Sequence, residues 1–255
     1  MTRRITWFLL ILLLCSDSSF SGDRWDSYVT YDWKQFKQDL NFNTVLYTGA
    51  WLSGMYAISH YDEDINSSVK GLYKGKFKTY IDIVDHLGNA PYSIPAMAGI
   101  AGLTLVGNNR KLHDAAFTSL EAACANVLLV GISKLMFGRN RPDAKKGAHD
   151  FSPFSFNQAS FPSGHASTAF ALITPWVYYY PGPLTYALLV IPASTALARM
   201  ILDRHWATDV LTGSLIGILI GYNLARWHKK LAADKNYYGG SDSDANLSVS
   251  FTIPF

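Results

Sequence analysis

Residues 164–180 read GHASTAFALITPWVYYY, an apolar stretch that contains no Asp, Glu, Lys or Arg. Further apolar stretches cover roughly 90–107, 114–137, 184–201 and 207–227. Turn residues separate them, as at Pro181-Gly182-Pro183, and no strand-like alternation persists among them. Small residues recur within the stretches and permit helices to pack closely. With another helix expected at 43–60, the sequence predicts an all-α bundle of about six core helices with short polar extensions at both ends.

The composition favours contact with a membrane. Of the 255 residues, 49% are hydrophobic and only 16% are charged, against about 25% in ordinary soluble domains. The net charge of +3 does not describe a nucleic-acid-binding protein. Most charge-free windows are shorter than the ~20 residues that a spanning helix needs. The sequence therefore leaves two alternatives, a membrane-embedded bundle and a soluble one.

The N-terminus has the features of an export signal. Arg3 and Arg4 precede an apolar run from Ile5 to Cys15, and small residues follow it. We expect a signal peptide over 1–21 that is cleaved after Ser21, with an uncleaved anchor as the alternative. The protein would then be periplasmic or membrane-associated, with its site on the exported side.

The remaining chain divides into three expected segments. Residues 22–86 form an N-terminal segment with the first helix and a Lys-rich connecting segment over 61–86. Residues 87–230 form the helical core. Residues 231–255 form a tail, in which the alternation over 246–255 predicts a short strand or an ordered end. Cys124 is expected to be a small buried hydrophobe.

A first polar segment closes the stretch 114–137. Lys134 and Arg141 are seven residues apart, so they can share a face if the helix continues for two turns. Pro142 disfavours helical geometry at Arg141, where the helix is expected to end. The segment predicts a cluster of cations suited to an anion; the alternative is an ordinary solvated basic helix end.

A second polar segment precedes the stretch 164–180. Ser163 is a natural N-cap residue, and the N–H groups that follow it would point out of the helix end. Gly164 lets a ligand approach the backbone closely, and His165 lies in the first turn. The segment predicts an anion site; the alternative is a plain capped helix with a surface histidine.

A third polar segment links the last two stretches. His205 and Asp209 are four residues apart, so they would be neighbours on a helix surface. A carboxylate on one imidazole nitrogen leaves the other nitrogen free to attack. Arg199 can clamp a phosphate through two hydrogen bonds. The alternative is a surface His–Asp pair.

Taken together, the segments Lys-x6-Arg-Pro, Pro-Ser-Gly-His and Arg-x5-His-x3-Asp carry a family signature. In this order they resemble the signature of the type 2 phosphatidic-acid phosphatase superfamily, which includes bacterial acid phosphatases, lipid phosphatases and vanadium haloperoxidases. The resemblance covers about residues 85–228. One departure is Ala198, where the third motif usually has serine.

This resemblance implies a role for each residue of the signature. His205 would attack phosphorus and form a phospho-histidine, Asp209 would orient it, and His165 would protonate the leaving group. The oxygens of the phosphate would be held by Lys134, Arg141, Ser163, Gly164 and Arg199. No metal or other cofactor is required.

We therefore expect a metal-independent phosphatase that hydrolyses a phosphate monoester or diphosphate of a lipid. Phosphatidylglycerol phosphate, phosphatidate, an isoprenoid diphosphate and a lipid A phosphate are the candidate substrates. The alternatives are a soluble periplasmic acid phosphatase, a vanadate-dependent haloperoxidase and a non-catalytic membrane or binding protein. The sequence specifies neither the substrate nor the oligomeric state.

Overall fold

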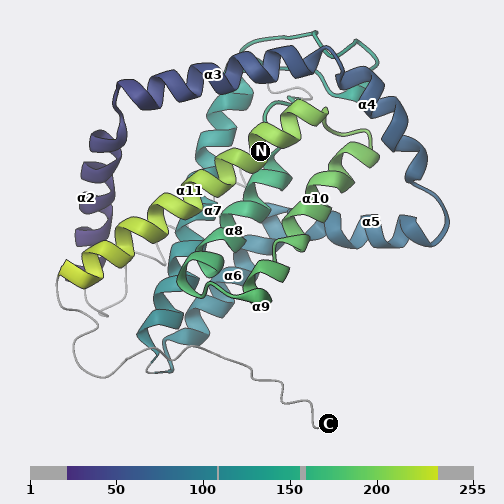
Figure 1. Cartoon of the computed structure of the whole chain (residues 1–255). Helices are drawn as coiled ribbons and strands as arrows, with labels where there is room; N and C mark the ends of the chain where they lie inside the picture. Colours follow the sequence, from purple (N-terminus) through teal and green to yellow (C-terminus); the bar gives the residue numbers. More distant parts are fainter. Residues whose placement is uncertain (1–21, 108, 156–158, 235–255) are drawn as a thin grey trace, which may run out of the picture. The chain divides into compact units, whose positions relative to one another are not determined.

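The computed structural model describes residues 22–107, 109–155 and 159–234 (Figure 1). The expected signal peptide over 1–21 and the expected strand over 246–255 lie outside these ranges. The helices are α2 (Gly22–Asp39), α3 (Phe42–Ser59), α4 (Asp62–Val69), η1 (Lys70–Leu72), α5 (Gly75–Leu87), α6 (Ala90–Thr104), α7 (Arg110–Phe137), η2 (Pro142–Ala144), α8 (Gly164–Tyr179), α9 (Pro183–Ala187), α10 (Val190–Ile201) and α11 (Ala207–Asp234). Among the described residues, β pairing is limited to the isolated bridge between Arg139 and Phe151. The all-α prediction is confirmed.

The chain forms two compact units that divide between Val45 and Leu46. The first contains α2, where Trp33 stacks on Phe36 and Lys37 lies over the Trp33 ring. The second contains the helices from α4 onward, and all residues of the predicted site belong to it.

Some helix boundaries differ from those expected. The segment 61–86, predicted only to connect, folds into α4, η1 and α5. Its charged residues obscured a buried face, because Ile81 and Val84 of α5 pack on Ala198 and Ile201 of α10. The stretch 184–201 divides into α9 and α10, and α11 continues to Asp234.

Helix α8 packs against both α7 and α11 (Figure 1). The small residues of α11 permit this contact, as expected. A Cβ atom added to Gly217 would lie 2.1 Å from the carbonyl oxygen of Ser167, and one added to Gly213 would lie 2.4 Å from that of Ser163. Glycine at these positions therefore brings the start of α8 directly against α11.

The core continues from α8 toward α6 and α7. Ile94, Met97, Leu120, Ala123 and Leu172 form one buried cluster. Cys124 packs against this cluster and is only partly buried. Tyr179 is 2% exposed, so it belongs to the core.

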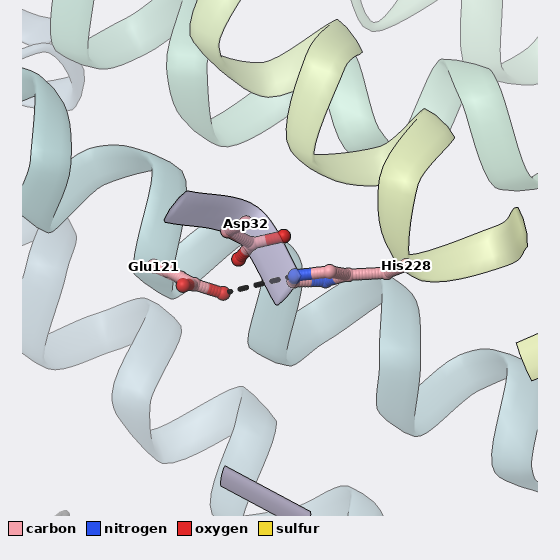
Figure 2. Close-up of side chains that lie close together, drawn as sticks. All are labelled: Asp32, Glu121 and His228. Atoms are coloured by element: carbon pink, nitrogen blue, oxygen red, sulfur yellow. Dashed lines mark ion pairs between the residues drawn. The ribbon is translucent and has the colours of Figure 1, made fainter. Parts of the chain in front are cut away.

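Within the part of the chain that the structure describes, three helical segments are long and apolar enough to cross a membrane, namely Arg110–Phe137, Pro183–Ile201 and Ala207–Ala233. Large apolar side chains on them are exposed, among them Leu128, Ile132 and Leu219. Figure 2 shows an ion pair between two of these helices, with His228 Nε2 of α11 3.5 Å from Glu121 Oε2 of α7. His228 Nδ1 also lies 2.9 Å from Thr118 Oγ1.

Candidate active site

The predicted site residues lie where four helices begin or end. Lys134 is in the last turn of α7, and Arg141 follows that helix. Ser163, Gly164 and His165 open α8, and Arg199 is in the last turn of α10. His205 precedes α11 and Asp209 lies in its first turn. Hydrogen bonds and an ion pair link Ser163, Arg199, His205 and Asp209. The charge of Arg199 acts on both Arg141 and His165.

Helix α7 ends earlier than the sequence predicted. Gly138 adopts a left-handed conformation (φ 56°) and donates its N–H to the Lys134 carbonyl at 2.9 Å. A side chain there would collide with the backbone of Ser152, since an added Cβ would lie 1.8 Å from its carbonyl oxygen. Arg141 therefore reaches the site from the loop after α7 and does not share a helical face with Lys134.

Lys134 ties the end of α7 to the segment before α8. Its Nζ donates to the carbonyl oxygens of Ala159 and Ser160 at 2.7 and 3.1 Å. A Cβ atom on Gly164 would lie 3.9 Å from Lys134 Cε. The ammonium group is thus fixed beside the first turn of α8.

The start of α8 has the expected N-cap at Ser163, whose backbone is extended (φ −71°, ψ 113°). The Ser163 N–H donates to the Asp209 carbonyl at 2.9 Å, which joins α8 to α11. Its hydroxyl group is buried and has no hydrogen-bond partner among the described residues, and the same holds for Nε of Arg141 and of Arg199. Leaving buried polar groups unpaired is costly. These three donors are therefore suited to an oxyanion.

His205 lies in the loop before α11, so the prediction of a shared helix surface with Asp209 was wrong in its geometry. The two side chains nevertheless meet, with Nδ1 of His205 3.8 Å from Oδ2 of Asp209. Ser160 connects them, since its hydroxyl donates to Asp209 Oδ2 and lies 3.3 Å from His205 Nδ1. Nδ1 is thereby occupied, and Nε2 is the nitrogen left to react.

Asp209 is held by more groups than the sequence indicated. The backbone N–H of Trp206 donates to Oδ2 at 2.9 Å, and Arg139 Nη1 donates to Oδ1 at 2.6 Å. Arg139 is 2% exposed and also contacts Asp62. Sequence reasoning missed Arg139, Ser160 and Asp62, because nothing in the spacing separates Arg139 from its neighbour Arg141 or links Asp62 to a motif more than 70 residues away.

Arg199 contacts both α5 and the loop that carries His205. Its carbonyl oxygen accepts the His205 N–H at 3.2 Å. Its Nη1 donates to Asp85 of α5 at 2.5 Å, a partner that the sequence did not reveal. The neighbouring Ala198 is fully buried in the cluster with Ile81 and Val84, an apolar setting that suits the missing hydroxyl.

Burial and nearby positive charges lower the pKa of both His165 and His205 and so favour their neutral forms. Burial, with Lys134 and Arg199 nearby, holds the pKa of His205 well below its usual 6.5. Burial and the charge of Arg199 lower the pKa of His165 to about 4, while Asp85 opposes that shift. A neutral His205 is a competent nucleophile. A protonated His165 would be favoured by a dianion in the pocket.

The arrangement can bind a tetrahedral anion and attack it. The side chains assembled here offer cationic and hydroxyl donors, and the carboxylates of Asp62, Asp85 and Asp209 are each paired with an arginine. This donor set fits a phosphate group held in front of an imidazole.

The chain is similar to known proteins of the PAP2 superfamily, some of which are phosphatases. The model of the PAP2 superfamily matches residues 115–233, which include all three motifs. The lipid A 1-phosphatase of Porphyromonas gingivalis is 30% identical over 158 residues, which are 60% of this chain and 32% of that protein. The lipid A 1-phosphatase of Rhizobium etli is 32% identical over 129 residues, 47% of this chain and 55% of that protein. The chain thus spans about a third to about half the length of these relatives.

Two solved structures share the fold. LpxE of Aquifex aeolicus superposes with a TM-score of 0.52 at 20% identity, covering 65% of this chain and 94% of that one. The transmembrane PAP2-type phosphatidylglycerolphosphate phosphatase of Bacillus subtilis superposes with a TM-score of 0.58 at 23% identity, covering 75% and 98%. The family resemblance of the three motifs is confirmed, because residues 115–233 match the PAP2 superfamily model.

Proposed function

We propose that this protein is a membrane-associated, metal-independent phosphatase that removes a phosphate group from a lipid, with lipid A 1-phosphate as the first substrate to test. The observation that supports it best is the set of buried, unpartnered donors on Ser163, Arg141 and Arg199, which belong to the same PAP2 domain as His205. The choice of lipid A follows two similar proteins, which are lipid A 1-phosphatases.

The reaction would proceed in two steps. First, Nε2 of His205 attacks phosphorus, and the bond from phosphorus to the lipid oxygen breaks as His165 protonates that oxygen. The positive charge on the His205 ring is stabilised by Ser160 and Asp209. Second, His165 takes a proton from water, the water oxygen attacks phosphorus, and the His205–phosphorus bond breaks to release inorganic phosphate.

The cations would act mainly in the transition state. Phosphoryl transfer depends largely on positioning and on stabilising charge at the non-bridging oxygens. Lys134, Arg141 and Arg199 would provide that charge, with the Ser163 hydroxyl and the Gly164 N–H completing the cradle.

A lipid substrate is supported by the surface around the bundle. Besides the three segments able to cross a membrane, α5 exposes Phe77, Tyr80 and Ile83 while its other face packs on α10. An exposed apolar stripe of this kind suits the interfacial region of a bilayer. Because Asp85 of α5 contacts Arg199, a lipid held at this helix would lie beside the pocket. With the expected export signal, the pocket would face the exported side.

The test is phosphate release by the detergent-purified chain, with a chelator present. The substrates are lipid A 1-phosphate, phosphatidylglycerol phosphate, phosphatidate, an isoprenoid diphosphate and the soluble p-nitrophenyl phosphate. We expect release from a lipid to exceed release from the soluble ester. Equal or greater turnover of the soluble ester would favour the acid phosphatase, and loss of all turnover in chelator would contradict a metal-independent reaction.

The intermediate needs a separate measurement. We expect substrate with labelled phosphate to leave label on the protein in a bond that is acid-labile and stable in alkali, as a phosphoramidate is. Label that is absent from wild type under rapid quench, or still present in His205→Ala, would contradict the assignment of the nucleophile.

A further inference from the structure

Helix α4 lies outside the residues that match the PAP2 superfamily. Its polar side chains nevertheless contact two loops that carry residues of the site. Glu63 Oε1 accepts the N–H of Ala148 at 2.9 Å, in the loop after α7. Asn66 Nδ2 donates to Oδ1 of Asp203 at 2.7 Å, in the loop that carries His205. Helix α4 therefore touches two of the segments that position the site.

Asp62, the first residue of α4, makes the deepest of these contacts. Its side chain is fully buried. Oδ2 pairs with Nη2 of Arg139 at 2.8 Å and accepts the Thr208 hydroxyl, while Oδ1 accepts the Thr208 N–H at 3.0 Å. Thr208 is the second residue of α11 and precedes Asp209. Asp62 thus satisfies a free N–H at the start of α11 from a separate helix.

Arg139 carries the contact onward to Asp209. Its Nη1 lies 2.6 Å from Asp209 Oδ1 and 2.8 Å from Thr208 Oγ1, and its Nε donates to Ala148 at 2.8 Å. One buried guanidinium is therefore shared between two buried carboxylates. Because the planar donors of arginine have a fixed geometry, moving either carboxylate changes the position of the other.

We propose that Asp62 is a positioning residue of the active site, which holds Asp209 and the start of α11 in register with His205 through Arg139 and Thr208. This inference rests on the proposed function for its role in turnover. Asp62 makes no contact with the reacting groups, so its effect falls on the orientation of His205. Substrate binding depends on the cradle and should be less affected.

The experiment compares Asp62→Asn with Asp64→Asn, the same change on an exposed residue of the same helix. We expect Asp62→Asn to lower kcat about ten- to a hundredfold, as loss of an orienting partner typically does, with KM within about twofold of wild type. Asp64→Asn should match wild type. Thermal unfolding in detergent, measured on each variant, separates turnover of folded protein from loss of fold.

A double-mutant cycle with Asp209→Asn tests the route of the effect. If Asp62 acts through Asp209, adding Asp62→Asn to Asp209→Asn should cost less than about threefold in kcat. The same fold-loss in both backgrounds, or an Asp62→Asn protein with wild-type kcat, would overturn the proposal. If Asp62→Asn does not fold, Thr208→Val replaces it in the cycle, and unchanged turnover of that variant would overturn the proposal equally.

Vanadate binding distinguishes failure of the positioning role of Asp62 from failure of the proposed phosphatase function. Wild type that releases phosphate from no substrate would contradict the function. Inorganic vanadate, followed by calorimetry, would still report the position of His205. We then expect at least about tenfold weaker binding for Asp62→Asn and unchanged binding for Asp64→Asn. Equal affinities would overturn the positioning role.

Discussion

The two halves of the site differ in how completely their polar atoms are paired. On the nucleophile side, the buried Asp209 carboxylate accepts from Ser160, Trp206 and Arg139. On the phosphate side, the Ser163 hydroxyl and Nε of two arginines are equally buried, and no described residue pairs with them. Among the described residues, the Asp209 carboxylate therefore has its partners within the chain, whereas three donors on the phosphate side have none.

The two sides would assist phosphate removal in different ways, one by orienting His205 and the other by binding the phosphate group. The nucleophile side fixes the ring of His205 before any substrate arrives, which lowers the cost of orientation. The phosphate side leaves donors unpaired at a cost to stability, and a bound phosphate would recover that cost. Substitutions on the first side should therefore reduce both stability and kcat. Substitutions on the second should reduce turnover with little loss of stability.

The largest effect is expected from His205→Ala. Removing the nucleophile should lower kcat by about 10⁴-fold or more, since residues that act as a unit lose nearly all their effect together. The control is His149→Ala, which removes an exposed histidine of the loop after α7. Phosphate release from a lipid substrate measures both. Residual activity of His205→Ala above about one hundredth of wild type would contradict the assignment.

The next effect is expected on the phosphate side, from Arg199→Lys. Lysine keeps the charge but loses the planar pair of donors, so kcat/KM should fall about 10²- to 10³-fold. Arg204→Lys is the matched control, because Arg204 forms the exposed ion pair with Asp143. An Arg199→Lys variant with wild-type kcat/KM would show that the charge of this residue, and not its donor geometry, is what the site uses.

Two buried serines offer the sharpest contrast between the halves. Ser163→Ala should lower kcat/KM about ten- to a hundredfold, because a hydrogen bond to a charged group is worth about 1.5–3 kcal/mol, and its melting temperature should not fall. Ser160→Ala should lower the free energy of unfolding by about 1–3 kcal/mol as well as kcat, since Asp209 loses a donor. Thermal unfolding and turnover are measured on both. A fall in the melting temperature of Ser163→Ala would contradict the proposed difference in stability effects between the two sides of the site.

The sequence predicted the phosphate side better than the nucleophile side. The residues proposed to bind phosphate fall in short motifs at helix ends, so Lys134, Ser163 and Arg199 could be found from local patterns. The supports of Asp209 come from Ser160, Arg139 and Asp62, of which Asp62 lies in a segment predicted only to connect. Contacts of this kind depend on how α4 and α11 pack, and no local pattern records them.

The errors in the helix boundaries have other causes. The helices were found because apolar stretches persist over many residues. The predicted stretch 114–137 ends where α7 ends, but the expected continuation to Arg141 is wrong because Gly138 adopts a left-handed conformation that stops the helix. The spacing of His205 and Asp209 suits a helix surface, whereas in the structure His205 lies in a loop and the Ser160 hydroxyl connects the two side chains.

The smallest effect is expected at Asp85, where α5 meets the phosphate side. The Asp85 charge raises the pKa of His165 against the lowering effects of burial and of Arg199, which bring it to about 4. Asp85→Asn should therefore lower that pKa further. His165 donates a proton only when it is protonated, so a lower pKa reduces the active fraction at any pH above it. The pH profile of kcat/KM should shift toward acid by up to about one pH unit, which corresponds to about 1.4 kcal/mol.

Asp82→Asn is the control, because Asp82 lies on the same helix and accepts a hydrogen bond from Tyr73 at 2.8 Å. A profile that stays in place, or moves toward alkaline pH, would show that Asp85 holds Arg199 without setting the protonation of His165.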